Sequence, residues 1–422
     1  MQATRLPQDL SNQLTETSRR MALLCAFGIP WANGFFNWGF YLMMICFLLG
    51  IGSQTRWREV LTSPVVIIAL LMFGWILLRT LTAPLGWDLA RPDLLNYRKL
   101  LAIPVLVTLF PTTEHKRQLV IAYCLGVAVL MLPTLLDGVG LGHLIEHMTF
   151  FKRNAAYSLT DRGAPNLVYW RNQIAHGFHV STLLAACLVS AVTCKRYRPH
   201  LIAVAALCAA DLLFFIYGRM ALLSLFVSLV VIGTLMLPSK KHVALMLGGI
   251  AILATTAFIT IPTVQVRLSS IKTETASFIA TKDITTAAGQ RLHYWGVSWD
   301  MFRESPLFGA GSGAFKARLR ATKDPLLPAG HGHTHDEYLT QLSLYGLVGL
   351  AFYLALLGIT FRNARRLGDP WLAGFTTSAV LLFALNAVTD SSLHNDWEGW
   401  TFVLLAAIAC GRIGDTRAKG SE

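Results

Sequence analysis

Charged residues are scarce in this sequence: they make up 14% of the 422 residues, whereas hydrophobic residues make up 54%. A water-soluble protein of this length cannot bury that much apolar surface. Apolar runs of roughly 18–20 residues, long enough to cross a bilayer as a helix, recur along the chain. The sequence therefore predicts an all-α integral membrane protein, because a helix satisfies its own backbone polar groups in lipid.

Several other features are missing. The first twenty residues are polar and show no cleavable signal peptide, so we interpret them as a short cytoplasmic tail. The 7 cysteines show no metal-ligand spacing, which favours buried apolar roles over disulfides. No internal repeat is visible. The segment FGAGSGAF, residues 308–315, follows no strand, so it predicts a flexible turn and excludes a nucleotide-binding loop.

The apolar runs predict about twelve membrane spans. They lie near 21–35, 36–52, 64–82, 100–111, 118–136, 174–193, 200–217, 220–237, 243–262, 338–361, 371–389 and 400–413. Lys and Arg clusters in the short loops then all fall on one side, which predicts that both termini are cytoplasmic. The domain organisation follows. Residues 1–262 hold the tail and spans 1 to 9, residues 263–337 form a large external loop, and residues 338–422 hold spans 10 to 12 and a cytoplasmic tail.

One segment tests this topology. From Leu201 to Pro238 the chain is almost continuously apolar except for YGRM at 217–220. We predict two spans with a turn at this motif, which puts Arg219 at their outer end. An arginine in the middle of a single long span would cost roughly 2.5–3.5 kcal/mol.

The external loop at 263–337 carries its own helical signal. Leu292, Trp295, Trp299 and Phe302 recur at helical spacing, and Pro306 ends the pattern, which predicts an amphipathic helix on the membrane surface. The loop has nine Lys/Arg against seven Asp/Glu. Either an ordinary solvated surface or an anionic partner at the outer leaflet explains this basic balance, and arginine commonly binds phosphate.

The stretch HGHTHDEYL concentrates titratable groups just before an apolar run. His331, His333 and His335 alternate, and Asp336 and Glu337 follow. Three interpretations remain open: a zinc site, polar residues that cap a helix, or a general base. For the last, His335 is the best candidate because it lies closest to the predicted membrane surface.

Two arginines are expected at the same depth as this histidine. Arg219 would lie at the end of a span and Arg291 at the start of the surface helix. A histidine base with arginines suits attack by a hydroxyl on a donor with a phosphate leaving group. The alternatives are that Arg219 caps a hairpin and that Arg291 is simply solvated.

These residues resemble the O-antigen ligase and polymerase superfamily of bacterial envelopes. The superfamily's ligases share a His followed by Asn, Ser or Gln, nine residues, and Gly-x-x-Gly. Here His335 and Asp336 are followed by nine residues and by Gly346 to Gly349. The position of Asp336 departs from that pattern. Further similarity lies in YGRMALLSL at 217–225, GQRLHYW at 289–295, SPLFGAGSGAF at 305–315 and WRNQIAHG at 170–177.

The resemblance implies a GT-C type glycosyltransferase fold of about twelve helices, with a large periplasmic loop between spans 9 and 10. It implies an O-antigen ligase that transfers polysaccharide from undecaprenyl pyrophosphate to a lipid A–core sugar at the periplasmic face of the bacterial inner membrane. Transfer would invert the anomeric centre and use no metal or cofactor. By the same resemblance His335 is the catalytic base, and Arg219 and Arg291 bind the pyrophosphate. Secondary candidates are Arg171, Asn172, His331, His333, Asp336, Asp390 and His394.

Competing functions stay open at this stage. An O-antigen polymerase or a protein O-oligosaccharyltransferase would use the same donor with another acceptor. A membrane transporter is a more distant alternative, although transporters usually carry repeats and charges near the midplane. Besides the two glycolipids, the expected partners are membrane lipids, and no nucleic acid is expected.

Overall fold

The computed structural model describes residues 7–50, 57–83, 85–144, 172–216, 219–236, 239–323 and 333–410. Within these ranges all regular structure is helical and no strand is present. The α-helices are α1 (Gln8–Gly28), α2 (Asn33–Gly50), α3 (Trp57–Leu61), α4 (Pro64–Leu81), α5 (Trp87–Tyr97), α6 (Ala102–Leu109), α7 (Thr113–Gly138), α8 (Gln173–Thr193), α9 (Arg198–Ala210), α10 (Arg219–Met236), α11 (Lys240–Thr260), α12 (Pro262–Thr281), α13 (Ala287–Glu304), α14 (Ala314–Ala321), α15 (Glu337–Ala364), α16 (Pro370–Asn386) and α17 (Asp396–Ala409).

Six helical stretches in the described part of the chain are long and apolar enough to cross a membrane. They are Pro64–Leu81, Thr113–Gly138, Gln173–Thr193, Lys195–Phe215, Lys240–Thr260 and Glu337–Ala364, and shorter apolar helices lie at Trp38–Gly50 and Pro370–Asn386. The all-α membrane protein predicted from the sequence is therefore confirmed. The count of about twelve spans stays a prediction.

The predicted polar tail is largely helical. Helix α1 begins at Gln8, well before the first apolar run, and packs along α2. Two serines explain this contact: Ser11 Oγ donates to Gly50 O at 2.9 Å, and Ser18 Oγ donates to Met43 O at 2.8 Å. These small polar residues lie on one face of α1 and let it pack closely against α2, so most of this polar segment is helical.

The predicted span at 100–111 is also different in the structure. It contains α6, which has only 8 residues, and all of them are buried. The preceding 3-10 turn, η2 (Arg98–Leu101), buries the side chain of Lys99. An apolar run this short is buried by neighbouring helices, because it cannot cross the bilayer alone.

Tyr217 and Gly218, where the turn is predicted, lie outside the described residues, but the structure describes the helices on both sides. Helix α9 continues into a π-helical turn, η6 (Asp211–Phe215), and α10 begins at Arg219. Within this pair, Asp211 Oδ2 lies 2.9 Å from Nε2 of His176 in α8, and both side chains are fully buried. The one acidic residue inside the predicted 200–217 span is thus paired with a neighbouring helix, as intramembrane carboxylates usually are.

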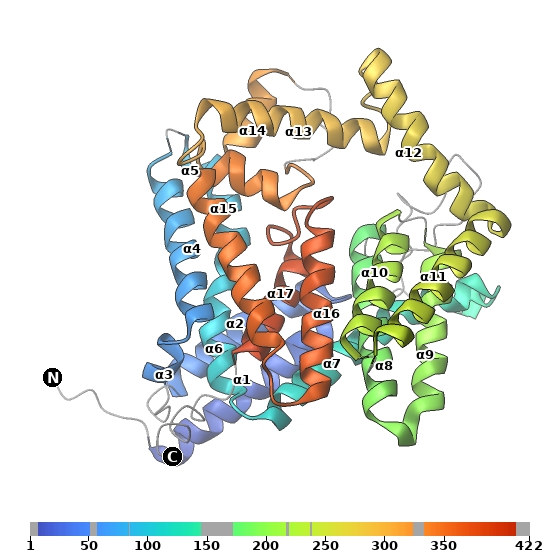
Figure 1. Cartoon of the computed structure of the whole chain (residues 1–422). Coiled ribbons are helices and arrows are strands. Elements are labelled where there is room, and N and C mark those ends of the chain that lie inside the picture. Colours follow the sequence, from blue (N-terminus) through green and yellow to red (C-terminus); the bar gives the residue numbers. More distant parts are fainter. Residues whose placement is uncertain are drawn as a thin grey trace.

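The external loop contributes α12, α13 and α14. Figure 1 shows α13 lying across the ends of the long helices, and α13 packs on α15. Its buried residues include Tyr294, Ser298 and Met301. Trp299, which belongs to the predicted apolar stripe, is 49% exposed, so that stripe remains available to a membrane surface.

The glycine-rich segment after α13 is anchored rather than flexible. Helix α15 is interrupted at Gly346, whose φ of 69° and ψ of −167° are non-helical. The interruption frees backbone groups that pair with the segment: Ala310 N donates to Ser343 O at 2.9 Å and Leu347 N donates to Pro306 O at 2.9 Å. These bonds hold the end of α13 against the first turns of α15.

Candidate active site

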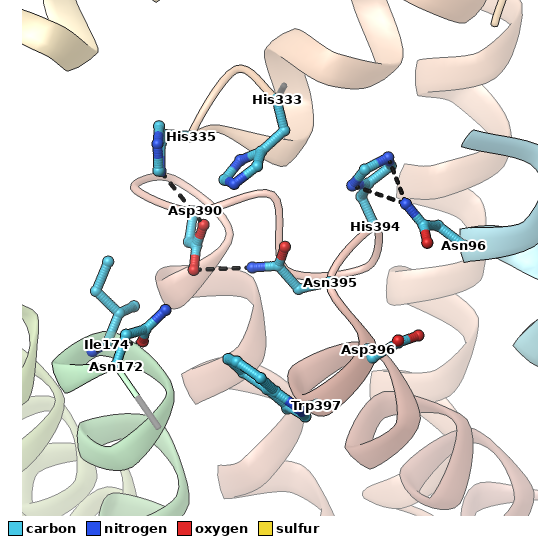
Figure 2. Close-up of a pocket in the computed structure, with 10 residues that line it drawn as sticks. All are labelled: Asn96, Asn172, Ile174, His333, His335, Asp390, His394, Asn395, Asp396 and Trp397. Carbon is cyan, nitrogen blue, oxygen red and sulfur yellow. Dashed lines mark hydrogen bonds and ion pairs between the residues drawn. The ribbon is translucent and has the colours of Figure 1, made fainter. Parts of the chain in front are cut away.

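A pocket of about 390 Å³ lies where α8, α15 and α17 begin, within the size range of small-ligand sites. We call it the histidine pocket. Figure 2 shows residues of these three regions converging on one space. Its lining residues are Asn96, Asn172, Ile174, His333, His335, Asp390, His394, Asn395, Asp396 and Trp397.

His335 occupies an unusual backbone conformation in this pocket. Its φ of 54° is in the left-handed region, which histidine adopts more often than most residues. Nδ1 of its imidazole lies 3.6 Å from Oδ1 of Asp390, and the ring stacks on Tyr294 of α13 with 6.0 Å between ring centroids. The strained backbone thus directs the imidazole between the α16–α17 loop and the external helix.

Asp390 is buried and is held in place by its own loop. Asn395 Nδ2 donates to Asp390 Oδ2 at 3.0 Å, and Ser391 N donates to Oδ1 at 2.9 Å. Burial raises the pKa of this carboxyl, but its interactions with His335, His333 and Arg291 outweigh burial and lower the pKa below its ordinary value. The carboxylate is therefore ionised beside His335.

Asp336 has a structural role in this arrangement. It is the N-cap of α15, and its Oδ1 accepts from Leu339 N at 2.9 Å. Asn and Ser are N-cap residues as well, so Asp fulfils the same local requirement at this position. Burial raises the pKa of Asp336 to about 6. The cap therefore carries a carboxyl that titrates near neutral pH.

Glu337 connects the start of α15 to α5 and to the α16–α17 loop, and the sequence analysis did not name it as a candidate site residue. Its carboxylate accepts a hydrogen bond of 2.9 Å from the Oη of Tyr97, which belongs to α5. It also accepts from the backbone N–H groups of Leu393 and His394, both at 3.0 Å. Asp336 and Glu337 thus hold the start of α15 through a cap and through these bonds.

His394, a secondary candidate, belongs to a second histidine–carboxylate pair. Its Nε2 lies 3.1 Å from Oδ1 of Asp93 and 2.9 Å from Nδ2 of Asn96. Lys99 Nζ fixes the same loop by donating to Asn395 O at 2.5 Å. The sequence analysis missed Asp93, Asn96 and Lys99, although twelve spans would have put the polar segment around them outside, on the side of the histidines.

His333 completes a group with metal-binding potential. The rings of His333 and His335 have centroids 4.1 Å apart. One donor atom from each of His333, His335 and Asp390 lies within 4.8 Å of the others. Two imidazoles and a carboxylate form a set that Zn²⁺ accepts, so the cluster could bind a divalent cation.

Helix N-termini also converge on the histidine pocket. Asn172 caps α8, with Oδ1 accepting from Ala175 N at 2.8 Å, and it lines the pocket. Asn395 is the N-cap of α17 and lines the pocket too. Since helix N-termini carry partial positive charge, they favour an anionic ligand in this space.

The remaining sequence candidates have different outcomes. Arg219 is the first residue of α10, which packs against α8 and α16. It follows η6, whose Asp211 contacts His176 within the first turns of α8, so its backbone lies at the pocket end of the bundle. Arg171 and His331 lie outside the described residues.

A comparison with known protein families gives one match. Residues 204–354 match the family model described as O-antigen ligase, which confirms the resemblance noted in the sequence. The matched region runs from within α9 into α15 and contains Arg219, Arg291 and His335. No curated protein sequence matches the chain.

Proposed function

With the O-antigen ligase match over residues 204–354 as the premise, we propose that this membrane protein is a glycosyltransferase that uses a lipid-linked pyrophosphate donor. Members of this family are ligases and polymerases of that type. The more specific proposal is an O-antigen ligase that moves a glycan from undecaprenyl pyrophosphate to a lipid A–core hydroxyl. The reaction would take place at the periplasmic face of the inner membrane, with both termini in the cytoplasm.

We assign the donor's pyrophosphate to the histidine pocket. Arg291 and Arg219 are the proposed contacts, since guanidinium groups bind phosphate oxygens in pairs. The N-termini of α8 and α17 add partial positive charge to the same space. The polyprenyl chain would remain among the spanning helices, which keeps the reactive end at the membrane surface.

The chemical step follows from the orientation of His335. Because Nδ1 faces Asp390, Nε2 is the nitrogen assigned to take the acceptor's proton. The acceptor oxygen then forms a bond to the anomeric carbon while the bond from that carbon to the pyrophosphate breaks. The electron pair leaves with undecaprenyl pyrophosphate, where the arginines stabilise its charge. Attack opposite the leaving group inverts the anomeric configuration.

A single observation carries this proposal. His335 lines the histidine pocket 3.6 Å from the buried carboxylate of Asp390, which supports a base beside a group that orients it. With Arg291 as the proposed cation for the leaving group, the set has the three components that glycosyl transfer to a hydroxyl requires.

The test is in vitro transfer from undecaprenyl-pyrophosphate glycan to lipid A–core, with chelator present throughout. Wild type should form the product, and His335→Asn should not. Asn is preferred over Ala because it tolerates the left-handed backbone at this position. His200→Asn, at an exposed histidine on α9, is the matched control and should remain active. Full activity of a folded His335→Asn variant would refute the assigned base.

The same assay separates the rival functions. If wild type leaves lipid A–core unchanged but lengthens the lipid-linked glycan, the protein is a polymerase. Modification of a serine or threonine in an added protein would indicate an O-oligosaccharyltransferase. A transporter would consume no donor in detergent, where no gradient exists. In all cases mass spectrometry measures the lipid-linked donor that is consumed and the lipid pyrophosphate that is released.

A further inference from the structure

A second pocket, of about 770 Å³, lies at the far end of the bundle from the histidine pocket. We call it the basal pocket. Helix α8 begins at the histidine pocket and reaches the basal pocket with Ser190 near its other end. Helix α16 begins at the basal pocket with Pro370 and leads to Asp390 at its other end. Because α8 and α16 extend along the bundle (Figure 1), the two pockets lie at opposite ends of it.

Polar side chains that line the basal pocket are held in place by an ion pair and a hydrogen bond to each other. Arg117 of α7 pairs with Asp369 at 2.5 Å, and Asp369 also caps α16. Trp371 Nε1 donates to Ser190 Oγ at 2.6 Å. These contacts join three helices at one level, so the opening between them is a fixed feature of the fold rather than a gap between loose side chains.

The rim of the basal pocket has a surplus of positive charge. Cys194 and Tyr197 line the pocket, and the residues next to them, Lys195, Arg196 and Arg198, are exposed. The guanidinium of Arg196 lies 5.4 Å from the ring centroid of Tyr197. Asp369 balances only Arg117, so this end of the pocket attracts an anion.

The rest of the lining is apolar and lies at the ends of spanning helices. Ile121, Leu201 and Pro370 form part of it. Trp371 and Tyr197 have the amphipathic rings that concentrate at membrane–water interfaces. An apolar cavity open at this depth, under a basic rim, matches an amphiphile with an anionic head and hydrocarbon tails.

We propose that the basal pocket binds one anionic phospholipid from the leaflet opposite the histidine pocket. The phosphate lies near Arg117, Lys195 and Arg196, and the acyl chains run along Ile121 and Leu201. This site goes beyond the proposed transferase activity and does not depend on it. Because the lipid would hold α7, α8, α9 and α16 together, it would also stabilise the bundle that carries the histidine pocket.

Native mass spectrometry of the purified full chain in detergent tests the site. Phosphatidylglycerol and phosphatidylcholine of equal chain length are added in parallel. Wild type should retain phosphatidylglycerol at least about tenfold more than phosphatidylcholine. The variant Lys195→Gln/Arg196→Gln should lose most of this preference. Lys240→Gln/Lys241→Gln removes the same charge from exposed residues at the start of α11 and should keep the preference.

A bulky substitution tests the proposed binding of the acyl chains independently of charge. Leu201→Trp would fill the pocket, whereas Leu207→Trp places the same ring on α9 at a residue that is 48% exposed and does not line the pocket. Leu201→Trp should reduce bound phosphatidylglycerol and the rise in Tm that this lipid produces, and Leu207→Trp should change neither. Equal retention by the pocket variants and their controls would overturn the proposal. Equal retention of phosphatidylglycerol and phosphatidylcholine by wild type would also overturn it. If undecaprenyl phosphate displaces the bound lipid and neither phospholipid does, the pocket binds the polyprenyl carrier instead.

Discussion

Nδ1 of His335 lies 3.6 Å from Oδ1 of Asp390, although one residue precedes α15 and the other follows α16. Neither position is fixed by local sequence alone. Glu337 ties the start of α15 to the loop after α16 by accepting from the backbone of Leu393 and His394. The fold thus converts two separated loops into one histidine–carboxylate pair that faces the histidine pocket.

This pair predicts a loss of catalytic rate when the carboxylate is removed. Asp390 is ionised beside His335, and it fixes which imidazole nitrogen carries the proton and which faces the acceptor. Asp390→Asn should therefore lower kcat at neutral pH by at least about tenfold, while the KM values for donor and acceptor change much less.

The control for this experiment is Asp300→Asn, at an exposed carboxylate on α13 outside the pocket. Its kcat and KM values should match those of wild type. If Asp390→Asn raises KM with kcat unchanged, Asp390 only supports the loop, and its assigned role as the partner of His335 is wrong.

The cluster of His333, His335 and Asp390 predicts inhibition by zinc. A Zn²⁺ ion bound there would occupy the proposed base, so added Zn²⁺ should stop transfer and chelator should restore it, whereas chelator alone should leave the rate unchanged. His333→Asn should need at least about tenfold more Zn²⁺ for half inhibition, relative to its own uninhibited rate. Loss of wild-type activity on exhaustive chelation, with recovery on added metal, would instead indicate a metal-dependent enzyme.

The cap residue Asp336 predicts a pH-dependent stability. Its folded-state pKa of about 6 lies above the ordinary value of 3.8 because of burial, so the folded protein binds this proton more tightly. That contribution to stability is present below pH 3.8 and is lost as the pH rises through about 6. Ionising the carboxyl by pH 7 costs on the order of 2 kcal/mol. Asp336→Asn keeps the cap and should raise Tm at pH 7, with a difference that shrinks toward pH 4.

Asp283 supplies a comparison of opposite sign. Hydrogen bonds from the Thr285 side chain and backbone, and from Ser277, lower the pKa of Asp283. Asp283→Asn should therefore reduce Tm at pH 7 or leave it unchanged, and it should not raise it. An Asp336→Asn variant whose Tm shift is the same at pH 4 and pH 7 would rule out titration as the cause.

The residues that the sequence identified best are those marked by local pattern. Periodicity predicted the helix that contains Arg291, and the alternating histidines marked His333 and His335. Asp390 and His394 were secondary candidates only, because nothing local links them to the histidines. Their place in the histidine pocket depends on the long-range bonds of Glu337, which no spacing rule reveals.

Other features were missed because their roles depend on which residues surround them in the folded protein. Lys99 was not a candidate, yet it is fully buried and donates to backbone carbonyls of the α16–α17 loop. The glycine-rich segment at 308–315 looked flexible, yet its backbone fills the interruption in α15. In both cases the partner is a backbone group far away in the sequence. Every residue has a backbone carbonyl, so the amino-acid sequence does not show which one will be the partner.

Arg291 predicts a defect specific to the donor. If it binds the leaving pyrophosphate, Arg291→Gln should reduce kcat/KM for the donor by roughly 100-fold or more, the usual effect of losing one preorganised charge-stabilising group. The KM for the acceptor should change much less. Arg303→Gln, at an exposed arginine on the same helix, removes the same charge from the external loop and should retain donor kinetics. Equal losses in the two variants would mean that only the overall charge of the loop matters.

The interruption of α15 predicts a position that requires glycine. Gly346 has a φ of 69°, and a Cβ built there would lie 2.3 Å from Leu307 O and 2.6 Å from Gly309 N. Both neighbours are backbone atoms, which cannot move aside without breaking the bonds between the glycine-rich segment and α15. Gly346→Ala should therefore destabilise the fold by about 2 kcal/mol or more.

Gly358 is the matched position in the same helix, because a Cβ there meets nothing within 4 Å. Gly358→Ala should be neutral or stabilise by about 0.5–1 kcal/mol, since alanine favours the helix. Melting in detergent gives the stability of both variants, and the transfer assay at a temperature well below Tm gives their activity. Because the segment that contacts Gly346 also fixes the end of α13, Gly346→Ala should lose transfer even where it remains folded. A stable and fully active Gly346→Ala variant would show that the segment can shift without moving Tyr294 and Arg291 relative to His335.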